Sequence, residues 1–492
     1  MKMEKWKMTL WETFVCLFLL FLTAVVIVSV IKPENNLPAV RMMWMPLVWV
    51  VAFAIMYVLL KKLDRILERM GYWIVLVLCI CYGIGVFVMA INSLNEPVHD
   101  QYHVLEGGKF FAGLTESISW EYFARCNNNI FPAAFLGILL RLGALFVPGN
   151  ALVVVVAWNV LQIVVVMLCS FWFMKRLVGN AAAYSVVFMQ MMFLPHFGHA
   201  ISAYTDMMTY GVGIVVLALF CKAKELCGTK KWVCLFFAGV LGGIGASIKM
   251  TVLIPLVAIV AWTVLREKRK NILWGFAPLL LATGICLVVN GWTATLPSEN
   301  LRDAYGTPKL SYWFAIGLQG NGGYVDNQEY SIEMSTVYGM DNKTAYTNAY
   351  IKDNLGKVVD LQHLTSKARY NFANGNMGTS IYVQNLEESH LLRRLMHYDG
   401  DLYWYQNLYA SGYQYALYLL IIVVLAFALF GKHKENVASI EVSLVAIFGI
   451  MLYLMLFEAN NRQLYNHIPF FILVAVYGVD RIVNLFLYIR KK

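Results

Sequence analysis

Titratable side chains gather directly after an apolar run of this 492-residue sequence, where the chain would leave a membrane. The stretch NEPVHDQYHVLEGGKFFAG, residues 95–113, follows the apolar run 72–91. It carries the acids and histidines Glu96, His99, Asp100, His103 and Glu106. A carboxylate at a membrane surface can accept a proton from a hydroxyl group that attacks a substrate. Asp100 is therefore a candidate general base.

Further charged and tyrosine residues lie at the ends of three later apolar runs. They are Tyr204, Asp206, Lys249, Glu458, Arg462 and Tyr465. Lysine and arginine can hold a phosphate group, and their attraction for it grows when the phosphate becomes a leaving group. Acids and cations that meet at one membrane surface, beside an apolar groove for a lipid tail, could move a sugar from a lipid phosphate onto a hydroxyl.

Metal binding is a separate question. His99 and His103 are four positions apart, so a helix would place both on one face. With Asp206 they are the candidate metal ligands of the sequence, although two histidines with one carboxylate between them do not make a known zinc motif. The sequence therefore identifies no definite cofactor. Whether the protein binds a divalent cation stays open.

The composition indicates the kind of protein that must position these residues. Hydrophobic residues make up 60% of the chain and charged residues 14%, whereas a soluble domain carries roughly 25% charge. The net charge of +10 does not indicate nucleic acid, because Lys and Arg form short clusters between apolar runs, the pattern that orients helices in a bilayer. We predict an all-α polytopic protein of the plasma membrane, in contact with lipids.

A membrane-spanning helix needs about 20 apolar residues. The predicted spans are 10–31, 43–60, 72–92, 151–173, 181–198, 207–221, 232–248, 251–265, 272–293, 412–430, 439–457 and 468–488. A further run, 131–149, has Arg141 in its middle, and a central arginine costs a few kcal/mol in a spanning helix. Since an even number of spans must join two outer loops, we predict about twelve spans and a surface helix at 131–149. The alternative, that 181–198 is the segment that does not cross, stays open.

The basic clusters orient these spans. They lie at both ends of the chain and around 61–69, 222–231, 266–270 and 432–434. Placing them in the cytoplasm leaves both termini inside and the loops 93–130, 199–206, 294–411 and 458–467 outside. All the candidate site residues then share the extracytoplasmic face.

The same pattern predicts four regions. They are an N-terminal two-helix extension, 1–71; a membrane core, 72–293, with the first outer loop at 93–130; a large outer loop, 294–411; and the C-terminal helices, 412–492. The large loop is rich in Tyr, Trp and Asn, so we expect it to be folded.

At these residues the sequence resembles the GT-C class of membrane glycosyltransferases. The resemblance is to bacterial members of the protein O-mannosyltransferase and aminoarabinose-transferase-like superfamily (glycosyltransferase family 39-like). The matching segments, in the order of the family, are PVHDQYHVLEGGKFFAG, AYTDMMTYGVGIVVLALF, GASIKMTVLIPL, YWFAIGLQGNGGY and FEANNRQLYNHIPF. The resemblance implies a GT-C fold and inverting sugar transfer from a polyprenyl-phosphate-linked donor to a hydroxyl on the outer face.

The resemblance also implies roles for single residues. Asp100 matches the catalytic carboxylate of the first loop, and Asp206 the acid of the second. Arg462 and Lys249 match the residues that contact the donor phosphate. Glu458, Tyr465, Tyr204 and His103 are taken as supporting residues. NNNIFPAAF stands where the family has a Glu-Lys-Pro-like motif, so the acceptor, a cell-surface glycan, lipid or protein, stays open.

Two other functions remain as alternatives. One is a transporter or flippase of lipid-linked sugars, and the other is a polysaccharide polymerase or ligase of another class. A transporter would place polar groups near the middle of the membrane, whereas a transferase needs Asp100 and Arg462 in one cleft at the outer surface.

Overall fold

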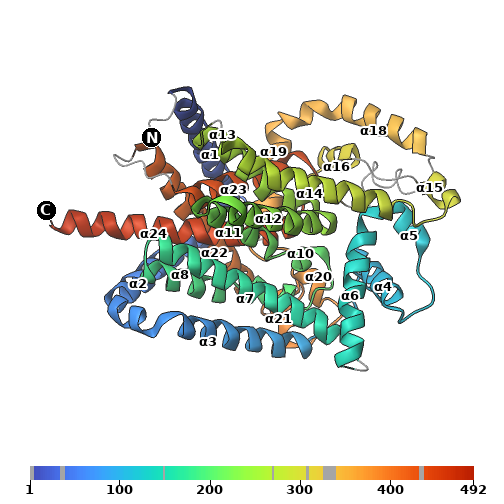
Figure 1. Ribbon diagram of the computed structural model, residues 1–492, viewed down its shortest axis with the longest axis horizontal. Helices are drawn as coiled ribbons and strands as arrows, with labels where there is room; N and C mark the ends of the chain where they lie inside the picture. Colours follow the sequence, from blue (N-terminus) through green and yellow to red (C-terminus); the bar gives the residue numbers. More distant parts are fainter. Residues whose placement is uncertain are drawn as a thin grey trace.

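The computed structural model describes residues 5–33, 39–147, 150–268, 271–305, 310–324, 340–430 and 437–491, and over these residues the chain is helical throughout (Figure 1). The longer helices are α1 (Lys5–Ile31), α2 (Ala39–Lys62), α3 (Asp64–Ile91), α6 (Ile130–Phe146), α7 (Leu152–Leu177), α11 (Val212–Glu225), α12 (Gly228–Ile248), α13 (Leu253–Arg266), α14 (Ile272–Thr293), α22 (Tyr403–Phe430), α23 (Ala438–Leu456) and α24 (Ile468–Lys491). Helices suit such apolar segments because lipid offers no partner to a backbone N–H or C=O group.

Eleven helices of the described residues are long and apolar enough to cross a membrane. The protein is therefore an integral multi-pass membrane protein. The count differs from the twelve expected spans at three places. The segment at 127–146 qualifies although it was expected not to cross, and Met250–Arg266 is an apolar helix of shorter length.

The third difference lies at 181–198, where a full span was expected. The helix there, α8 (Asn180–Met191), has only 12 residues and is followed by α9 (Pro195–His199). At 1.5 Å per residue, α8 alone is about 18 Å long, which is shorter than the roughly 30 Å hydrocarbon core. The residues Ala181–Val187 are all buried, so this segment runs through the interior of the bundle.

The helix expected at the outer surface, 131–149, corresponds to α6. Figure 1 shows α6 running across one end of the molecule, roughly perpendicular to α3 and α7. It packs closely on α4 (Asp100–Ala112), because a Cβ added to Gly137 would lie 2.7 Å from Phe111 Cβ. The side chain of Arg141 is exposed. This orientation fits a helix at the membrane surface, and that placement stays a prediction.

Labelling of position 150, just after α6, tests this placement. Asn150 is exposed, and in a variant whose only cysteine is Asn150→Cys we expect a membrane-impermeant maleimide added to intact cells to react. The matched control is a second variant that retains only Cys227, which is exposed in the predicted cytoplasmic turn after α11 and should react only after the cells are opened. If position 150 behaves like Cys227, α6 crosses the membrane and the predicted topology is wrong.

Over its described residues, the chain between α14 and α22 does not show the single large folded loop that we expected at 294–411. Its described helices are α15 (Glu299–Tyr305), α16 (Leu310–Gly317), α18 (Met340–Asn354), α19 (Leu361–Phe372), α20 (Ser380–Val383) and α21 (Leu391–Met396). They pack on different parts of the molecule: α15 on α5 (Trp120–Arg125), α19 on α1 and α23, α20 on α9, and α21 on α22. Some of their apolar side chains, including Phe372 and Val383, are buried in the core of the membrane bundle. Ala315 and Ile316 of α16 instead form a small cluster with side chains of α18.

Both chain ends lie at the same end of the molecule, opposite to α4, α5 and α6 (Figure 1). The first two helices are not set apart from the rest, because α1 packs on α13, α19 and α22, and α2 packs on α8, α22 and α24. The cytoplasmic location of the termini and the division into four regions stay predictions.

Candidate functional site

Segments distant in sequence enclose a cavity of about 870 Å³. Its lining comes from the beginning of α4, the segment around α5, the end of α12, the segment before α24 and parts of the chain between α14 and α22, among them α16 and α18. Of the residues singled out in the sequence, His99, Asp100, His103, Tyr204, Lys249, Glu458 and Arg462 line it. The fold thus brings most of the predicted site into one cavity.

Asp100 is the first residue of α4, where the helix dipole favours a negative charge. The chain turns into this helix at His99, whose φ of 52° lies in the left-handed region. Asp100 is exposed to the cavity. Its Oδ1 accepts a hydrogen bond from the Tyr122 hydroxyl at 2.8 Å, and its Oδ2 accepts one from the Tyr204 hydroxyl at 3.2 Å. Both carboxylate oxygens are therefore held in place.

Tyr122 is itself fixed by two neighbours. Its hydroxyl accepts a hydrogen bond of 2.6 Å from Asn129 Nδ2, and the His103 ring stacks on its ring with centroids 4.0 Å apart. Burial and the Asp100 charge raise the pKa of both Tyr122 and Tyr204 well above the usual range. Both tyrosines therefore stay protonated and donate to Asp100. Burial also lowers the pKa of His103, so its ring is neutral near pH 7.

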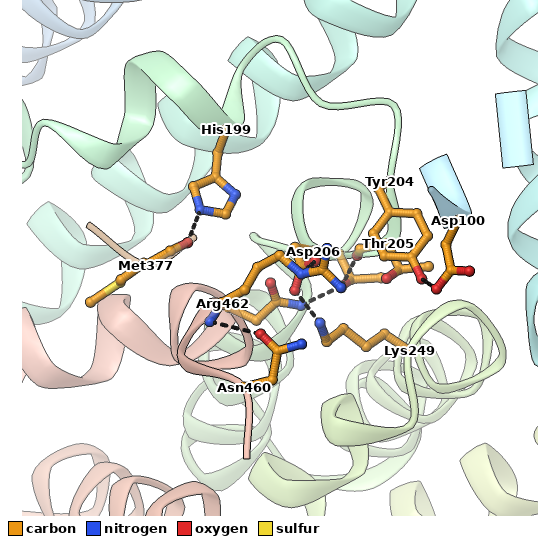
Figure 2. Close-up of polar contacts among 11 residues, drawn as sticks. Asp100, His199, Tyr204, Thr205, Asp206, Lys249, Met377, Asn460 and Arg462 are labelled. Atoms are coloured by element: carbon orange, nitrogen blue, oxygen red, sulfur yellow. Dashed lines mark hydrogen bonds and ion pairs between the residues drawn. The ribbon is translucent and has the colours of Figure 1, made fainter. Parts of the chain in front are cut away.

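A buried ion network lies beside Asp100. Asp206, in α10 (Thr205–Met208), is completely buried and forms an ion pair with Lys249 Nζ at the end of α12. Arg462 Nε lies 3.0 Å from Asp206 Oδ2, and Figure 2 shows both basic side chains pointing toward this carboxylate. The Arg462 guanidinium also lies 4.8 Å from the centre of the Tyr204 ring. Tyr204 thus connects the ion network to Asp100.

The two cations retain access to the cavity, but Asp206 does not. The side chains of Lys249 and Arg462 are 10% and 17% exposed, whereas that of Asp206 is 0% exposed. Burial lowers the pKa of Lys249, and the adjacent Asp206 carboxylate opposes this effect. Asp206 therefore orients the side chains of Lys249 and Arg462, which can both still contact a ligand in the cavity.

Glu458 is a second carboxyl group on the cavity wall. Burial raises its pKa to about 7, against the opposing effect of the Arg462 charge. The group therefore changes charge near neutral pH.

The comparisons with known proteins can now be set beside this geometry. A family model described as "Conserved hypothetical integral membrane protein" matches residues 2–483. The chain belongs to this family. A comparison with curated proteins found no match.

The fold of this family member is distantly similar to those of two solved proteins. ArnT from Cupriavidus metallidurans in the apo state is 12% identical, with a TM-score of 0.36 over 84% of this chain and 78% of that one. The same protein bound to undecaprenyl phosphate is 13% identical, with a TM-score of 0.37 over 83% and 77%. The archaeal oligosaccharyltransferase AglB from Archaeoglobus fulgidus, in complex with an inhibitory peptide and a dolichol phosphate, is 11% identical, with a TM-score of 0.32 over 83% and 56%.

The charged residues of the ion network in this family member lie at the ends of apolar helices. The segment Thr205–Glu225 begins one residue before Asp206, Gly228–Ile248 ends one residue before Lys249, and Asn461–Ile489 begins one residue before Arg462. A transporter was expected to place such groups near the middle of the spans, and the network does not have that arrangement.

The candidate metal ligands do not come together. Across the described part of the chain, no three His, Cys, Asp or Glu residues lie close enough to hold a metal ion. His103 is stacked on Tyr122, while Asp206 is paired with two cations. The divalent-cation alternative therefore has no site among these residues.

Two predicted site residues do not line the cavity, and two residues of the site were not predicted. Asp206 is buried behind Lys249 and Arg462, and Tyr465 is buried with its hydroxyl 2.9 Å from His196 Nδ1. Tyr122 and Asn129 escaped sequence reasoning because no spacing relates them to Asp100. The run of asparagines at 127–129 could have drawn attention to Asn129, since this run stands where the family has a Glu-Lys-Pro-like motif after the first loop.

Proposed function

We propose that the protein is a membrane glycosyltransferase that moves a sugar from a polyprenyl-phosphate-linked donor to an acceptor hydroxyl, with inversion. The observation that carries the proposal is one cavity that presents a carboxylate, Asp100, beside two cations, Lys249 and Arg462, at the ends of apolar helices. This combination fits a reaction that needs a proton acceptor and an anionic leaving group at the boundary between lipid and water.

In the proposed reaction, Asp100 accepts the proton of the acceptor hydroxyl as its oxygen attacks the anomeric carbon. The bond between that carbon and the phosphate oxygen breaks, and the electron pair leaves with the polyprenyl phosphate. Arg462 and Lys249 stabilise the negative charge that develops there. Attack from the face opposite to the phosphate gives the inverted product.

The surrounding residues have positioning roles in this scheme. Tyr122 and Tyr204 hold the two oxygens of Asp100. We expected Asp206 to be a second catalytic acid, but its complete burial favours a different role, in which it orients Lys249 and Arg462. The cavity of about 870 Å³ is within the range of roughly 300–1,000 Å³ for small-molecule sites. The donor's lipid chain would lie in the membrane, and the acceptor would be a cell-surface glycan, lipid or protein on the extracytoplasmic face.

The test is a transfer assay with the full-length protein in lipid nanodiscs. Polyprenyl-phosphate donors carrying radiolabelled hexoses or pentoses are offered with a membrane and cell-wall extract as the acceptor. We expect labelled product and free polyprenyl phosphate to appear together. In proteoliposomes, movement of intact donor across the bilayer without release of polyprenyl phosphate would contradict the proposal and favour a flippase.

A further inference from the structure

A tight turn at residues 374–379 packs against the phosphate-binding arginine. Met377 and Gly378, in the middle of the turn, have φ values of 50° and +72°. Left-handed conformation is uncommon for a residue with a side chain, so Met377 needs support from its surroundings. The turn is also tied to α22 by a hydrogen bond of 3.1 Å from Gly375 N to Ser411 Oγ.

His199 supplies that support. Its Nε2 donates a hydrogen bond of 3.0 Å to the carbonyl oxygen of Met377 (Figure 2). The histidine is completely buried, and burial lowers its pKa to about 3, so its ring is neutral. The ring stacks on Tyr465 with centroids 3.6 Å apart and planes 10° apart.

The turn contacts the stem of Arg462 directly. A Cβ added to Gly378 would lie 3.1 Å from Arg462 Cβ and 3.4 Å from its Cγ. Tyr465, on which His199 stacks, lies in the same 3-10 helix as Arg462, η5 (Asn461–His467). His199 therefore supports Arg462 from two sides, through the turn and through this helix, although His199 does not line the cavity.

We propose that His199 is a positioning residue for the donor phosphate, because its bond to Met377 holds the turn against Arg462 and so directs the guanidinium into the cavity. This role rests on the proposed function. The proposal adds His199 and the turn at 374–379, between α19 and α20, to the residues that support binding of the lipid phosphate.

Two substitutions separate the hydrogen bond from the ring stacking. His199→Phe keeps a ring against Tyr465 but lacks the donor, whereas His199→Gln keeps an N–H donor. Binding of undecaprenyl phosphate to each variant is measured in nanodiscs. We expect His199→Phe to bind on the order of tenfold more weakly, the scale of one lost hydrogen bond, and His199→Gln to recover most of the loss. His390→Phe is the control, because His390 Nδ1 accepts a hydrogen bond from a backbone N–H group of α21, outside the cavity.

Two further measurements distinguish positioning from general damage. In an Arg462→Ala background, His199→Phe should cause no additional loss of binding, since its effect passes through the arginine. Hydrogen–deuterium exchange should rise at 374–379 in His199→Phe and not in His199→Gln. If His199→Phe does not fold, Gly378→Ala takes its place, because the added methyl group would press on the Arg462 stem, and we expect a similar loss.

The outcomes are distinct. Equal affinity of the wild type and His199→Phe, or of the wild type and Gly378→Ala, would overturn the positioning role while the proposed function stands. A loss of similar size when Arg462 is already absent would also overturn it. If the wild-type protein binds no undecaprenyl phosphate, the proposed function is itself overturned, and this role with it.

Discussion

Replacing Asp100 with asparagine is expected to leave the protein folded and to lower sugar transfer by at least about a hundredfold, the scale of a lost general base. Asparagine has nearly the same shape, and its carbonyl oxygen can still accept a hydrogen bond from one of the two tyrosines that now hold the carboxylate. It cannot take up a proton from the acceptor. The loss should therefore appear in kcat, measured as labelled product per minute, while undecaprenyl phosphate still binds.

Two control substitutions make this result specific to Asp100. Glu106 lies on the same helix, pairs with Lys109 and does not line the cavity, so Glu106→Gln should transfer sugar normally. Glu458 is the rival base, because it lines the cavity and its pKa is raised to about 7. Near-normal transfer by Asp100→Asn, together with a large loss in Glu458→Gln, would move the base to Glu458.

The pH dependence of donor affinity gives a second way to distinguish the role of Glu458 from that of Asp100. A group whose pKa is about 7 is neutral below that pH and negative above it. The negative form of Glu458 repels the donor phosphate, so the affinity for donor should fall as the pH rises through about 7. Any part of the pH profile that disappears in Glu458→Gln belongs to Glu458, and the part that remains belongs to other groups.

Replacing Arg462 with alanine is expected to weaken donor binding and also to slow the chemical step, each on the order of ten- to a hundredfold, as for a lost hydrogen bond between charged groups. The guanidinium is paired with Asp206 through Nε and lines the cavity, so we propose that its terminal nitrogens contact the phosphate. Its attraction grows as the phosphate leaves, and an interaction that strengthens in the transition state raises kcat as well as affinity.

Arg462→Lys should also be impaired, though less than Arg462→Ala. A lysine has one nitrogen and cannot contact Asp206 and grip two phosphate oxygens in the manner of a guanidinium. Lys249→Ala should be milder than Arg462→Ala if Lys249 is the second contact. Arg394→Lys is the matched control, because Arg394 forms an exposed bidentate pair with Asp401, at 2.9 and 2.7 Å, away from the cavity. Affinity and kcat at the wild-type level in Arg462→Ala would leave the phosphate without its proposed partner.

The sequence alone singles out most of the charged residues that line this cavity, for a physical reason. The hydrocarbon core excludes ionised groups, so Asp100, Lys249 and Arg462 stand at the ends of apolar runs, where they can be recognised without a structure. The predicted alternation of spans places all these ends on one face, and the structure brings the three side chains to one cavity. The resemblance to GT-C transferases gave them roles, and those roles remain proposals.

The uncharged partners could not be found in this way. Tyr122, Asn129 and Met377 act through contacts that depend on how α4, α5 and the turn at 374–379 pack together, and an isolated tyrosine or methionine carries no such information. The single folded loop expected at 294–411 is not seen over the described residues, for a related reason. Its aromatic and apolar residues indicate burial, but the sequence does not reveal that some of them, such as Phe372 and Val383, are buried against the membrane helices, while those of α16 and α18 pack on one another.

The position of Arg462 just before α24, the last helix, has a consequence for biosynthesis. A ribosome makes Asp206 and Lys249 long before Arg462, so these two can pair with each other while the arginine is still missing. The nascent chain at that stage has neither the complete ion network nor the wall of the cavity that η5 provides. Under the proposed function, the donor-phosphate site is therefore complete only after η5 and α24 have been made and inserted, and a chain that stops before η5 would lack it.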